Sequence, residues 1–295
     1  MSKTLVGILC GLGAASIWGG MYVVSKVVLD IIPPFSLVTL RLTLGILTLL
    51  VVLIIRGFPK IPGRLFWHVI GVGLVGYGIS LSLQFLGTKL STAANGSLVT
   101  SATPAFVLVF ARLLLKERIT PRRLLALLLA TLGVVAVIDP RAVQLNPDLF
   151  LGNLLLLGAG ITWALYSVLV RKITQVLDVL SFSLIAFLGG LPVSVPAGVW
   201  ELKTVAIGEI SLGVVGGILF LGIISTALAM VLWNTAFAFT DANLASLTFF
   251  AQPLIGTLLG WLILDEEITP LFLIGGLFIG IALFIASYKD DKFFA

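Results

Sequence analysis

Long apolar runs follow one another along almost the whole chain, and the short connections between them carry most of the charged residues. A helix needs about 20 apolar residues to cross a lipid bilayer. Runs this long, without alternation of polar and apolar residues, are typical of membrane helices rather than barrel strands, because a chain in hydrocarbon must satisfy its own backbone hydrogen bonds. The sequence predicts an all-α polytopic membrane protein. The ten predicted transmembrane helices are residues 5–28, 34–55, 66–87, 93–114, 121–138, 149–170, 180–200, 210–236, 243–264 and 270–288.

Composition excludes several other classes of protein. Hydrophobic residues make up 59% of the 295 positions and charged residues 11%, whereas a soluble domain is about half apolar and about a quarter charged. A single cysteine, Cys10, and a single histidine, His68, exclude a disulfide framework and argue against metal sites and histidine-based catalysis. No phosphate-binding glycine loop with Lys-Ser/Thr is present, which argues against ATP as the driving force. We expect no enzyme activity and no cofactor.

The basic residues predict which side of the membrane each connection faces. Ten spans place the N-terminus, the even-numbered connections and the C-terminus on one side, and cytoplasmic connections are enriched in lysine and arginine. That side carries Lys3, Arg56, Lys60, Arg64, Lys116, Arg118, Arg122, Arg123, Arg171, Lys172, Lys289 and Lys292. The other side carries Lys89, Arg141 and Lys203, with Lys26 near the outer end of the first helix. We therefore expect a multi-pass protein of the cell (inner or plasma) membrane with both termini in the cytoplasm.

The chain also contains an internal repeat. Equivalent positions lie 145 to 149 residues apart and divide the chain into residues 1–140 and 141–295, with five helices each. An odd number of spans turns the second half upside down in the membrane, and such inverted repeats are typical of secondary transporters with a substrate site near the midplane. The matching pairs are 93–98 with 242–247, Trp18 with Trp163, Lys26 with Arg171, Pro104 with Pro253, and Glu117 with Glu266.

These motifs together resemble a known family. The segment Gly13-Ala14-Ala15-Ser16-Ile17-Trp18-Gly19, Arg41 in the second helix, and Pro104 followed by Lys116-Glu117-Arg118-Ile119-Thr120-Pro121 resemble the drug/metabolite transporter superfamily. More closely, the whole chain is similar to its ten-helix EamA-type exporters. The resemblance implies export of amino acids and other metabolites from bacteria. The second half has no counterpart to Arg41, so its role is not duplicated.

The fourth and ninth helices are predicted to form part of the substrate site. Positions spaced by three and four residues share one helical face, and each of the two faces ends on a proline near the bilayer centre. We expect Pro104 and Pro253 to act as hinges, because a mid-helix proline frees the carbonyl four residues earlier; the alternative is that neighbouring helices satisfy that carbonyl. The predicted cavity-lining residues of these helices are Ser97, Ser101, Ser246 and Phe250.

Aromatic and amide side chains on other helices complete the predicted site. Trp18 and Trp163 lie about halfway along their spans, too deep for the aromatic belt at the membrane surface. Indole rings with a free donor suit an amphipathic organic solute, although each ring taken singly could equally serve packing. We expect the first, third, fourth, sixth, eighth and ninth helices to line a central cavity. The further predicted substrate-binding residues are Trp18, Tyr22, Tyr77, Gln84, Trp163, Tyr166 and Asn234.

Three charged residues have a predicted structural or gating role. Arg41 lies about seven residues inside the second helix, where a buried cation needs a partner. It could recognise a substrate carboxylate, but its shallow depth favours gating or a structural bond to free carbonyls near the membrane face. Glu117 and Glu266 precede Thr-Pro pairs and are expected to be structural, close to exposed backbone donors at a helix N-terminus.

The sequence favours a secondary carrier that works by alternating access. The alternatives are a multidrug or cationic-compound efflux carrier and, less favoured, a channel-like facilitator. No acidic residue lies deep in a span, so transport is either facilitated diffusion or coupled to protons by a route that the sequence does not reveal. The expected partners are a small-molecule substrate and the lipid bilayer, with no nucleic acid, and the expected state is a monomer or weak homodimer.

Overall fold

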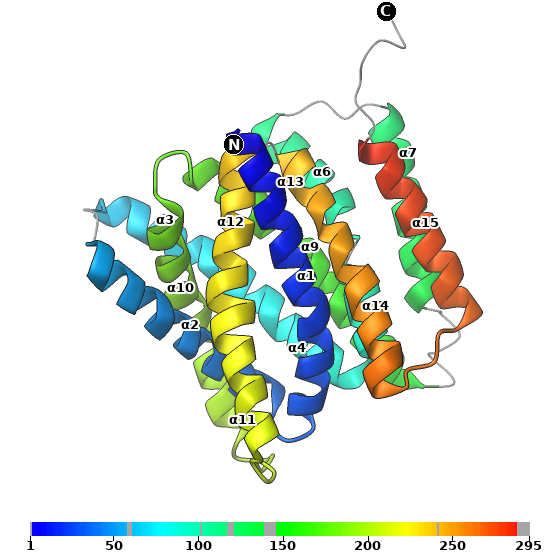
Figure 1. Ribbon diagram of the computed structural model, residues 1–295, viewed down its shortest axis with the longest axis horizontal. Coiled ribbons are helices and arrows are strands. Elements are labelled where there is room, and N and C mark those ends of the chain that lie inside the picture. Colours follow the sequence, from blue (N-terminus) through cyan, green and yellow to red (C-terminus); the bar gives the residue numbers. More distant parts are fainter. Residues whose placement is uncertain are drawn as a thin grey trace, which may run out of the picture.

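The computed structural model of the protein describes residues 2–57, 61–100, 102–116, 121–138, 146–240 and 242–287, and every regular element in these ranges is helical (Figure 1). Seven helical segments in this part of the chain are long and apolar enough to cross a membrane. They are Lys3–Leu29, Pro34–Arg56, Gly63–Leu90, Ala93–Leu115, Pro147–Ile173, Val179–Glu201 and Leu212–Phe239. The predicted all-helical, polytopic architecture is confirmed at this level.

Helix boundaries follow the predicted spans closely, with differences of at most three residues at any end. The elements are α1 (Lys3–Leu29), α2 (Pro34–Arg56), α3 (Gly63–Gly73), η1 (Leu74–Ser80), α4 (Leu81–Leu90), α5 (Ala93–Thr100), α6 (Thr103–Leu115), α7 (Pro121–Ile138), α9 (Pro147–Ile173), α10 (Val179–Glu201), α11 (Leu212–Leu219), η2 (Phe220–Leu228), α12 (Ala229–Phe239), α13 (Ala242–Leu247), η3 (Thr248–Phe250), α14 (Ala251–Leu264) and α15 (Pro270–Ser287).

Polar side chains fix where several helices begin. A side-chain oxygen just before a helix accepts a hydrogen bond from one of the first backbone N–H groups, which have no partner within the helix. Asn146 does this for α9, Asp178 for α10 and Ser211 for α11. Thr269 caps α15 in the same way, because it accepts a hydrogen bond from the backbone N–H of Phe272 at 3.1 Å.

Four predicted helices are interrupted rather than continuous. The third and eighth spans each contain a π-helical segment, η1 and η2, which widens the turn locally. The fourth and ninth spans divide just before their prolines, so Pro104 and Pro253 lie in the first turns of α6 and α14 rather than in helix interiors. The reason is that proline has no N–H and clashes with the preceding turn, whereas the first turn tolerates it.

The helices pack in pairs that match between the two halves of the chain. α1 packs against α12 and α14, and α9 packs in the equivalent way against α4 and α6. α2 packs on α10, and α7 on α15. In Figure 1, α7 and α15 lie together at one end of the long axis, while α2, α3 and α10 lie at the other. Each of these helices therefore packs against partners equivalent to those of its counterpart in the other half.

A close approach of two glycines sets the distance between α4 and α9. A Cβ atom built on Gly87 or Gly152 would lie 2.9 Å from the carbonyl oxygen of the other. Such contacts need residues without side chains. Ser80, one helical segment earlier, donates a hydrogen bond to the Ala159 carbonyl oxygen at 2.9 Å, so the two helices run antiparallel with α4 ending beside the start of α9.

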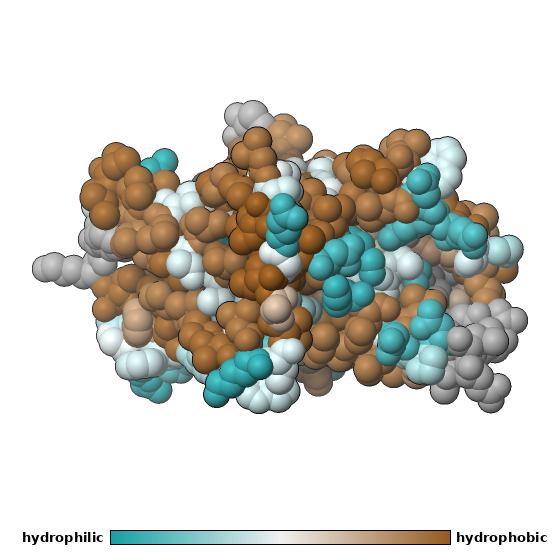
Figure 2. Space-filling model, turned by 90° about the horizontal axis from the view of Figure 1, so that it is seen from below, coloured by the Kyte–Doolittle hydropathy of each residue, from teal (hydrophilic) through white to brown (hydrophobic). Residues whose placement is uncertain are grey.

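In contrast to a soluble protein, this protein has apolar side chains on its outer surface and several polar side chains in its interior. Large apolar side chains are exposed on the outer surfaces, for example Leu212 and Trp67, which are 88% and 70% exposed. Arg41, Asn234 and Gln252 are almost completely buried. Figure 2, a view onto the end of the molecule where α11 lies, shows hydrophobic residues covering most of the face, with hydrophilic residues in separate patches. This distribution suits a lipid environment, in which polar groups find their partners within the protein.

Candidate functional site

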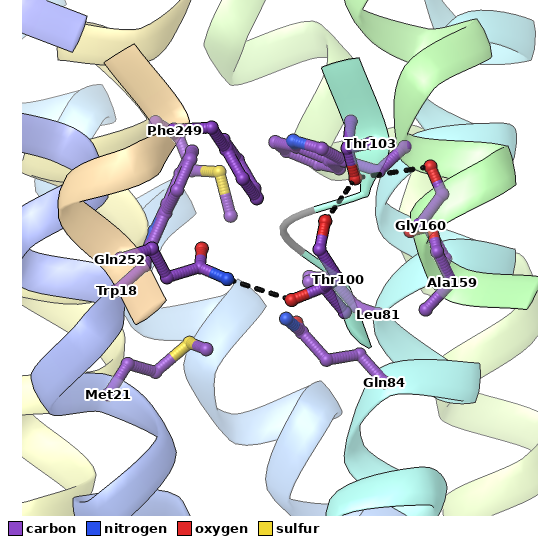
Figure 3. Close-up of a pocket in the computed structure, with 13 residues that line it drawn as sticks. Trp18, Met21, Leu81, Gln84, Thr100, Thr103, Ala159, Gly160, Phe249 and Gln252 are labelled. Carbon is purple, nitrogen blue, oxygen red and sulfur yellow. Dashed lines mark hydrogen bonds between the residues drawn. The ribbon is translucent and has the colours of Figure 1, made fainter. Parts of the chain in front are cut away.

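A small cavity lies at the centre of the helix bundle, where segments of both halves meet (Figure 3). It is formed by the six segments that the sequence predicted around a central cavity, and no described residue of α2, α7, α10 or α15 lines it. The volume open to the centre of a water molecule is about 20 Å³, which is room for about one water. The lining residues are Trp18, Met21, Ser80, Leu81, Gln84, Thr100, Thr103, Ala159, Gly160, Trp163, Met230, Phe249 and Gln252.

One wall of the cavity is organised around the hydroxyl of Thr100, the last residue of α5. Gln252 donates to Thr100 Oγ1 at 2.7 Å, and the Tyr22 hydroxyl lies 2.8 Å from the same oxygen. Gln84 in turn donates to the Tyr22 hydroxyl at 2.5 Å. In Figure 3 the amides of Gln252 and Gln84 both extend toward Thr100. This network joins helices of the two halves at the point where the fourth span is broken.

The break itself is stabilised by a second threonine. The Thr103 hydroxyl donates to the carbonyl oxygen of Thr100 at 2.6 Å. Proline at position 104 removes the N–H that would otherwise bond this carbonyl in a continuous helix. A side chain of the same span, rather than a neighbouring helix, thus satisfies the freed carbonyl.

A second polar network lies behind the cavity wall. The Tyr77 and Tyr166 hydroxyls are 2.5 Å apart, Tyr166 donates to Asn234 Oδ1 at 2.9 Å, and Asn234 Nδ2 donates to Ser183 Oγ at 2.9 Å. All four residues are essentially inaccessible to solvent. The pairing of Tyr166 with Asn234 mirrors that of Tyr22 with Gln84 in the other half. Both networks hold tyrosine rings in fixed positions around the cavity.

Four aromatic rings form the most apolar side of the cavity region. Trp18 packs edge-on against Trp163 at 5.5 Å between ring centroids, and it also contacts Trp233 and Phe249. The indole nitrogen of Trp18 donates to the Ser225 carbonyl oxygen at 3.0 Å. Trp163 also lines the cavity, and its indole nitrogen is buried without a hydrogen-bond partner among the described residues. A buried donor without a partner is costly, and it can be satisfied by a water or a bound solute.

Arg41 lies directly behind the cavity wall, deeper than predicted. Its side chain is 0% exposed, and its Nε donates to Thr226 Oγ1 at 2.8 Å. The Nη2 atom lies within 3.4 Å of both oxygens of Ser225, in the π-helical segment η2. Its bonds therefore reach the middle of a span rather than free carbonyls near the membrane face.

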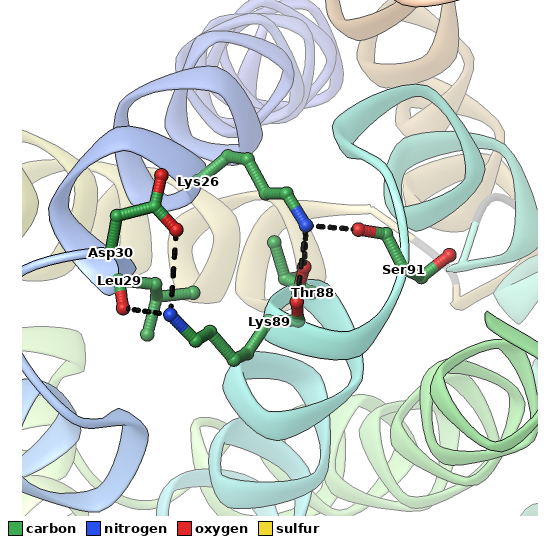
Figure 4. A network of polar contacts seen from close by, with 6 residues as sticks. All are labelled: Lys26, Leu29, Asp30, Thr88, Lys89 and Ser91. Atoms are coloured by element: carbon green, nitrogen blue, oxygen red, sulfur yellow. Dashed lines mark hydrogen bonds and ion pairs between the residues drawn. The ribbon is translucent and has the colours of Figure 1, made fainter. Parts of the chain in front are cut away.

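Two further cations close the ends of neighbouring helices. Lys26 of α1 donates to the last carbonyl oxygens of α4, those of Thr88 and Lys89, each at 3.1 Å, and to that of Ser91 (Figure 4). Lys89 donates in return to the Leu29 carbonyl oxygen at the end of α1, at 2.7 Å. A cation is stabilising at a helix C-terminus, because the last carbonyls have no partner there.

The second half repeats this arrangement with a different cation. Arg171 of α9 donates to the carbonyl oxygens of Phe237, at 3.0 Å, and of Thr240 at the end of α12. The paired positions of Lys26 and Arg171 in the repeat therefore have equivalent contacts. The sequence indicated the pairing but gave no function to either residue.

Carboxylates cap the N-termini of helices from the opposite half. Glu266 accepts hydrogen bonds from the backbone N–H groups of Ala93 and Ala94, at 2.6 and 2.7 Å. It therefore caps α5, not α15, the helix that follows it and that the sequence favoured. Glu201 accepts from the backbone N–H of Ser36 at 2.9 Å, at the start of α2. Sequence reasoning did not single out Glu201, because a carboxylate at a helix end is ordinary by sequence alone.

The predicted site residues fall into four groups. Trp18, Gln84 and Trp163 line the cavity, whereas Tyr22, Tyr77, Ser97, Tyr166 and Asn234 lie in the buried layers behind it. Ser246 is buried in α13 and does not line it. Ser101 and Glu117, and the side chain of Phe250, lie outside the described residues.

Several lining residues were not predicted. Gln252 is the clearest, since it is 1% exposed and bonds to Thr100 across the halves. Its signal in the sequence is an amide in an apolar run, directly before Pro253. Met21 and Met230 carry no such signal, because methionine is also an ordinary core residue.

The cavity contains no formal charge, and the described part of the chain has no cluster of metal-ligating residues. The lining offers amide and hydroxyl groups on one side and indole and phenyl rings on the other. Such a mixture can bind a solute with an apolar body and a polar end, once the helices move apart to make room.

Comparison with known proteins identifies the family. The sequence pattern of the EamA-like transporter family matches residues 5–138 and again residues 150–288. The uncharacterized transporter YyaM of Bacillus subtilis strain 168 is 26% identical over 251 residues, which cover 83% of this chain and 81% of the relative. The uncharacterized transporter YoaV of the same organism is 24% identical and covers 99% of both chains.

The fold is also found in a solved structure. A crystal structure of another protein, 20% identical, superposes with a TM-score of 0.70 over 95% of this chain and 96% of that one. This likeness shows that the arrangement of helices is an existing natural fold. Because the family pattern covers most of the sequence in two copies, the chain belongs to the EamA-like transporter family of the drug/metabolite transporter superfamily.

Proposed function

We propose that this transporter is a secondary carrier that exports small organic metabolites, amino acids foremost, across the cell membrane by alternating access. Aromatic and amphipathic amino acids fit the lining best. The observation that carries the proposal is the cavity between the halves, which is lined by Trp163, a residue whose buried indole N–H has no partner among the described residues. A solute carbonyl or carboxylate oxygen in the cavity would accept this hydrogen bond.

The proposed mechanism rests on an inverted repeat of residues 1–140 and 141–295 with ten spans. Three observations support it: the family pattern matches twice, the neighbours of each helix agree between halves, and Lys26 and Arg171 make equivalent helix-end contacts. Two such halves can rock about a central site and open it to either side in turn. A cavity with room for about one water then corresponds to the closed intermediate.

Two different functions compete with this proposal. A multidrug carrier for organic cations would share the aromatic lining, since a tryptophan face also attracts cations. A channel would share the repeat but needs a continuous pore, whereas the cavity has room for about one water and the side chains of Gln252 and Thr100 are bonded to each other beside it. The amino-acid carrier is favoured because the unpartnered group at the cavity is a donor, which suits an acceptor such as a carboxylate.

Counterflow in proteoliposomes tests the proposal. Purified protein would be reconstituted with unlabelled L-phenylalanine inside the vesicles, and uptake of labelled L-phenylalanine would be followed. A carrier gives transient accumulation that saturates with external substrate. A linear flux without counterflow would support the channel instead, and counterflow of organic cations without that of amino acids would support the multidrug alternative.

A further inference from the structure

Arg41 is a buried cation without a negatively charged partner in the part of the chain that the structure describes. Among the described residues, Lys89 forms an ion pair with Asp30, whereas Arg41 forms no ion pair. Its neighbours are the Thr226 hydroxyl, the Ser225 oxygens and the face of the Phe85 ring, 4.7 Å from the guanidinium carbon. Burying a cation among neutral groups is costly, and residues kept in this state within membrane spans usually serve a ligand or ion.

The weakest of its contacts is the one that faces the cavity. Arg41 Nη1 lies 3.5 Å from the sulfur of Met21, and a thioether is a poor acceptor. Met21 is itself a lining residue. The flexible side chain of Met21 therefore contacts both the guanidinium and the cavity. Methionine has three rotatable bonds and readily repacks.

The surroundings of the cavity add no negative charge that would favour a cation. The lining residues are all neutral, and the cation Arg41 contacts one of them, Met21, from behind. A cationic solute in this low-dielectric space would be repelled, and a solute with a carboxylate would be attracted.

On the basis of the carrier function proposed above, we propose that Arg41 binds the carboxylate of the transported solute after Met21 turns aside. The solutes are then amino acids or related organic acids, and not organic amines. Met21 covers the cation while the cavity is closed. The carboxylate replaces the thioether on Nη1 and leaves the bonds to Thr226 and Ser225 in place, so Arg41 stays anchored to η2 throughout the cycle.

The charge at this place can be measured without knowing the natural solute. The native thiol is removed by Cys10→Ala, and Met21→Cys places a thiol on the cavity side of Arg41. The introduced thiol is then reacted with an anionic and with a cationic methanethiosulfonate. Each rate is divided by the rate of the same reagent with free 2-mercaptoethanol, which corrects for its intrinsic reactivity. The ratio of the two corrected rates reports the electrostatic potential at the thiol. Thr103→Cys, on the same cavity but on α6, is the matched control.

We expect Met21→Cys to favour the anionic reagent by about fivefold or more over Thr103→Cys. Arg41→Gln should abolish this preference, and Arg41→Lys should keep it, which separates loss of charge from loss of fold. Equal reaction with both reagents, or no reaction at position 21 while position 103 reacts, would overturn the proposal.

Competition with labelled L-phenylalanine in counterflow tests the same idea on transport. The competitors share one phenyl body and differ in charge: 3-phenylpropanoate, phenylalaninamide and phenethylamine. We expect 3-phenylpropanoate to compete about tenfold better than either amine, and Arg41→Gln to remove the difference. Amines that compete as well as the acid would overturn the inference and leave the carrier function standing. Absence of all counterflow would instead contradict the carrier function, and the thiol reactivity would still decide the role of Arg41.

Discussion

For single residues of the cavity, the sequence indicates how deep a side chain lies along its helix, but not toward which neighbour it points. The depth of Trp18 and Trp163 could be read from their distance to the span ends, and both line the cavity. Whether a ring lines a cavity or lies one layer behind depends on helix rotation by a few tens of degrees. For that reason Tyr22 and Tyr166 were predicted in the lining but lie behind it.

Gln252 and Met21 line the cavity but could not be predicted to do so. A lone amide or a methionine in an apolar run is compatible with any buried position. Only the packed structure shows that Gln252 reaches Thr100 of the other half. The sequence can indicate which helices meet, but not which of their side chains touch.

Removing the free indole donor gives a residue-scale prediction. Trp163→Phe keeps an aromatic ring but loses the N–H that has no partner among the described residues. We expect KM for counterflow to rise about fivefold to tenfold, the effect of one hydrogen bond, with thermal stability nearly unchanged. Trp163→Ala should weaken transport further while the protein still reaches the membrane. Trp67→Phe, on an exposed ring of α3, is the control. An unchanged KM in Trp163→Phe would remove this residue from the site.

At the scale of helices, the sequence predicted where elements begin and end but not where they break. Apolar runs and capping residues set the ends, and these were accurate to three residues. The π-helical segments η1 and η2 contain no proline from which a break could be predicted. Both lie beside the site, since Ser80 of η1 lines the cavity and Ser225 of η2 bonds to Arg41.

The cap on α5 gives a first prediction for an element. Glu266→Gln keeps the size of the side chain but removes the charge that two backbone N–H groups share. We expect a loss of about 1–2 kcal/mol in stability, seen as a lower apparent Tm in detergent. Glu267→Gln, its exposed neighbour, should change little. Equal effects of the two substitutions would show that the cap contributes nothing.

The contact between α4 and α9 gives a second prediction at the scale of helices. Gly152→Ala would place a methyl group 2.9 Å from the Gly87 carbonyl oxygen, so the helices must separate. We expect a destabilisation of about 2 kcal/mol, typical of overpacking, in thermal unfolding of the purified protein. Gly158→Ala in the same helix meets only the end of Leu83 at 3.4 Å and should be neutral or stabilising, because alanine favours helix. Similar losses in both variants would contradict the packing argument.

For the whole molecule, duplication is the property that sequence and structure express in different ways. The sequence shows it as matching residues 145 to 149 positions apart, and the family pattern shows it as two successive matches. The structure shows it as equivalent neighbours for equivalent helices. Arg41 departs from this symmetry, since the second half offers no counterpart. In the described structure Arg41 has no ion-pair partner and lies on one side of the cavity, and this asymmetry is consistent with the proposed solute with one charged end.

The proposed orientation in the membrane is the last prediction, and it belongs to the whole chain. With ten spans and basic residues gathered in the cytoplasm, the connection after α9 faces the cytoplasm and the connection after α10 faces outward. Gln175 and Lys203 are exposed in these connections. In a Cys10→Ala background, a membrane-impermeant thiol reagent added to intact cells should label Lys203→Cys and leave Gln175→Cys unlabelled until the membrane is permeabilised. The reverse pattern would invert the topology, and labelling of both in intact cells would mean that the two connections lie on the same side, so that α10 does not cross.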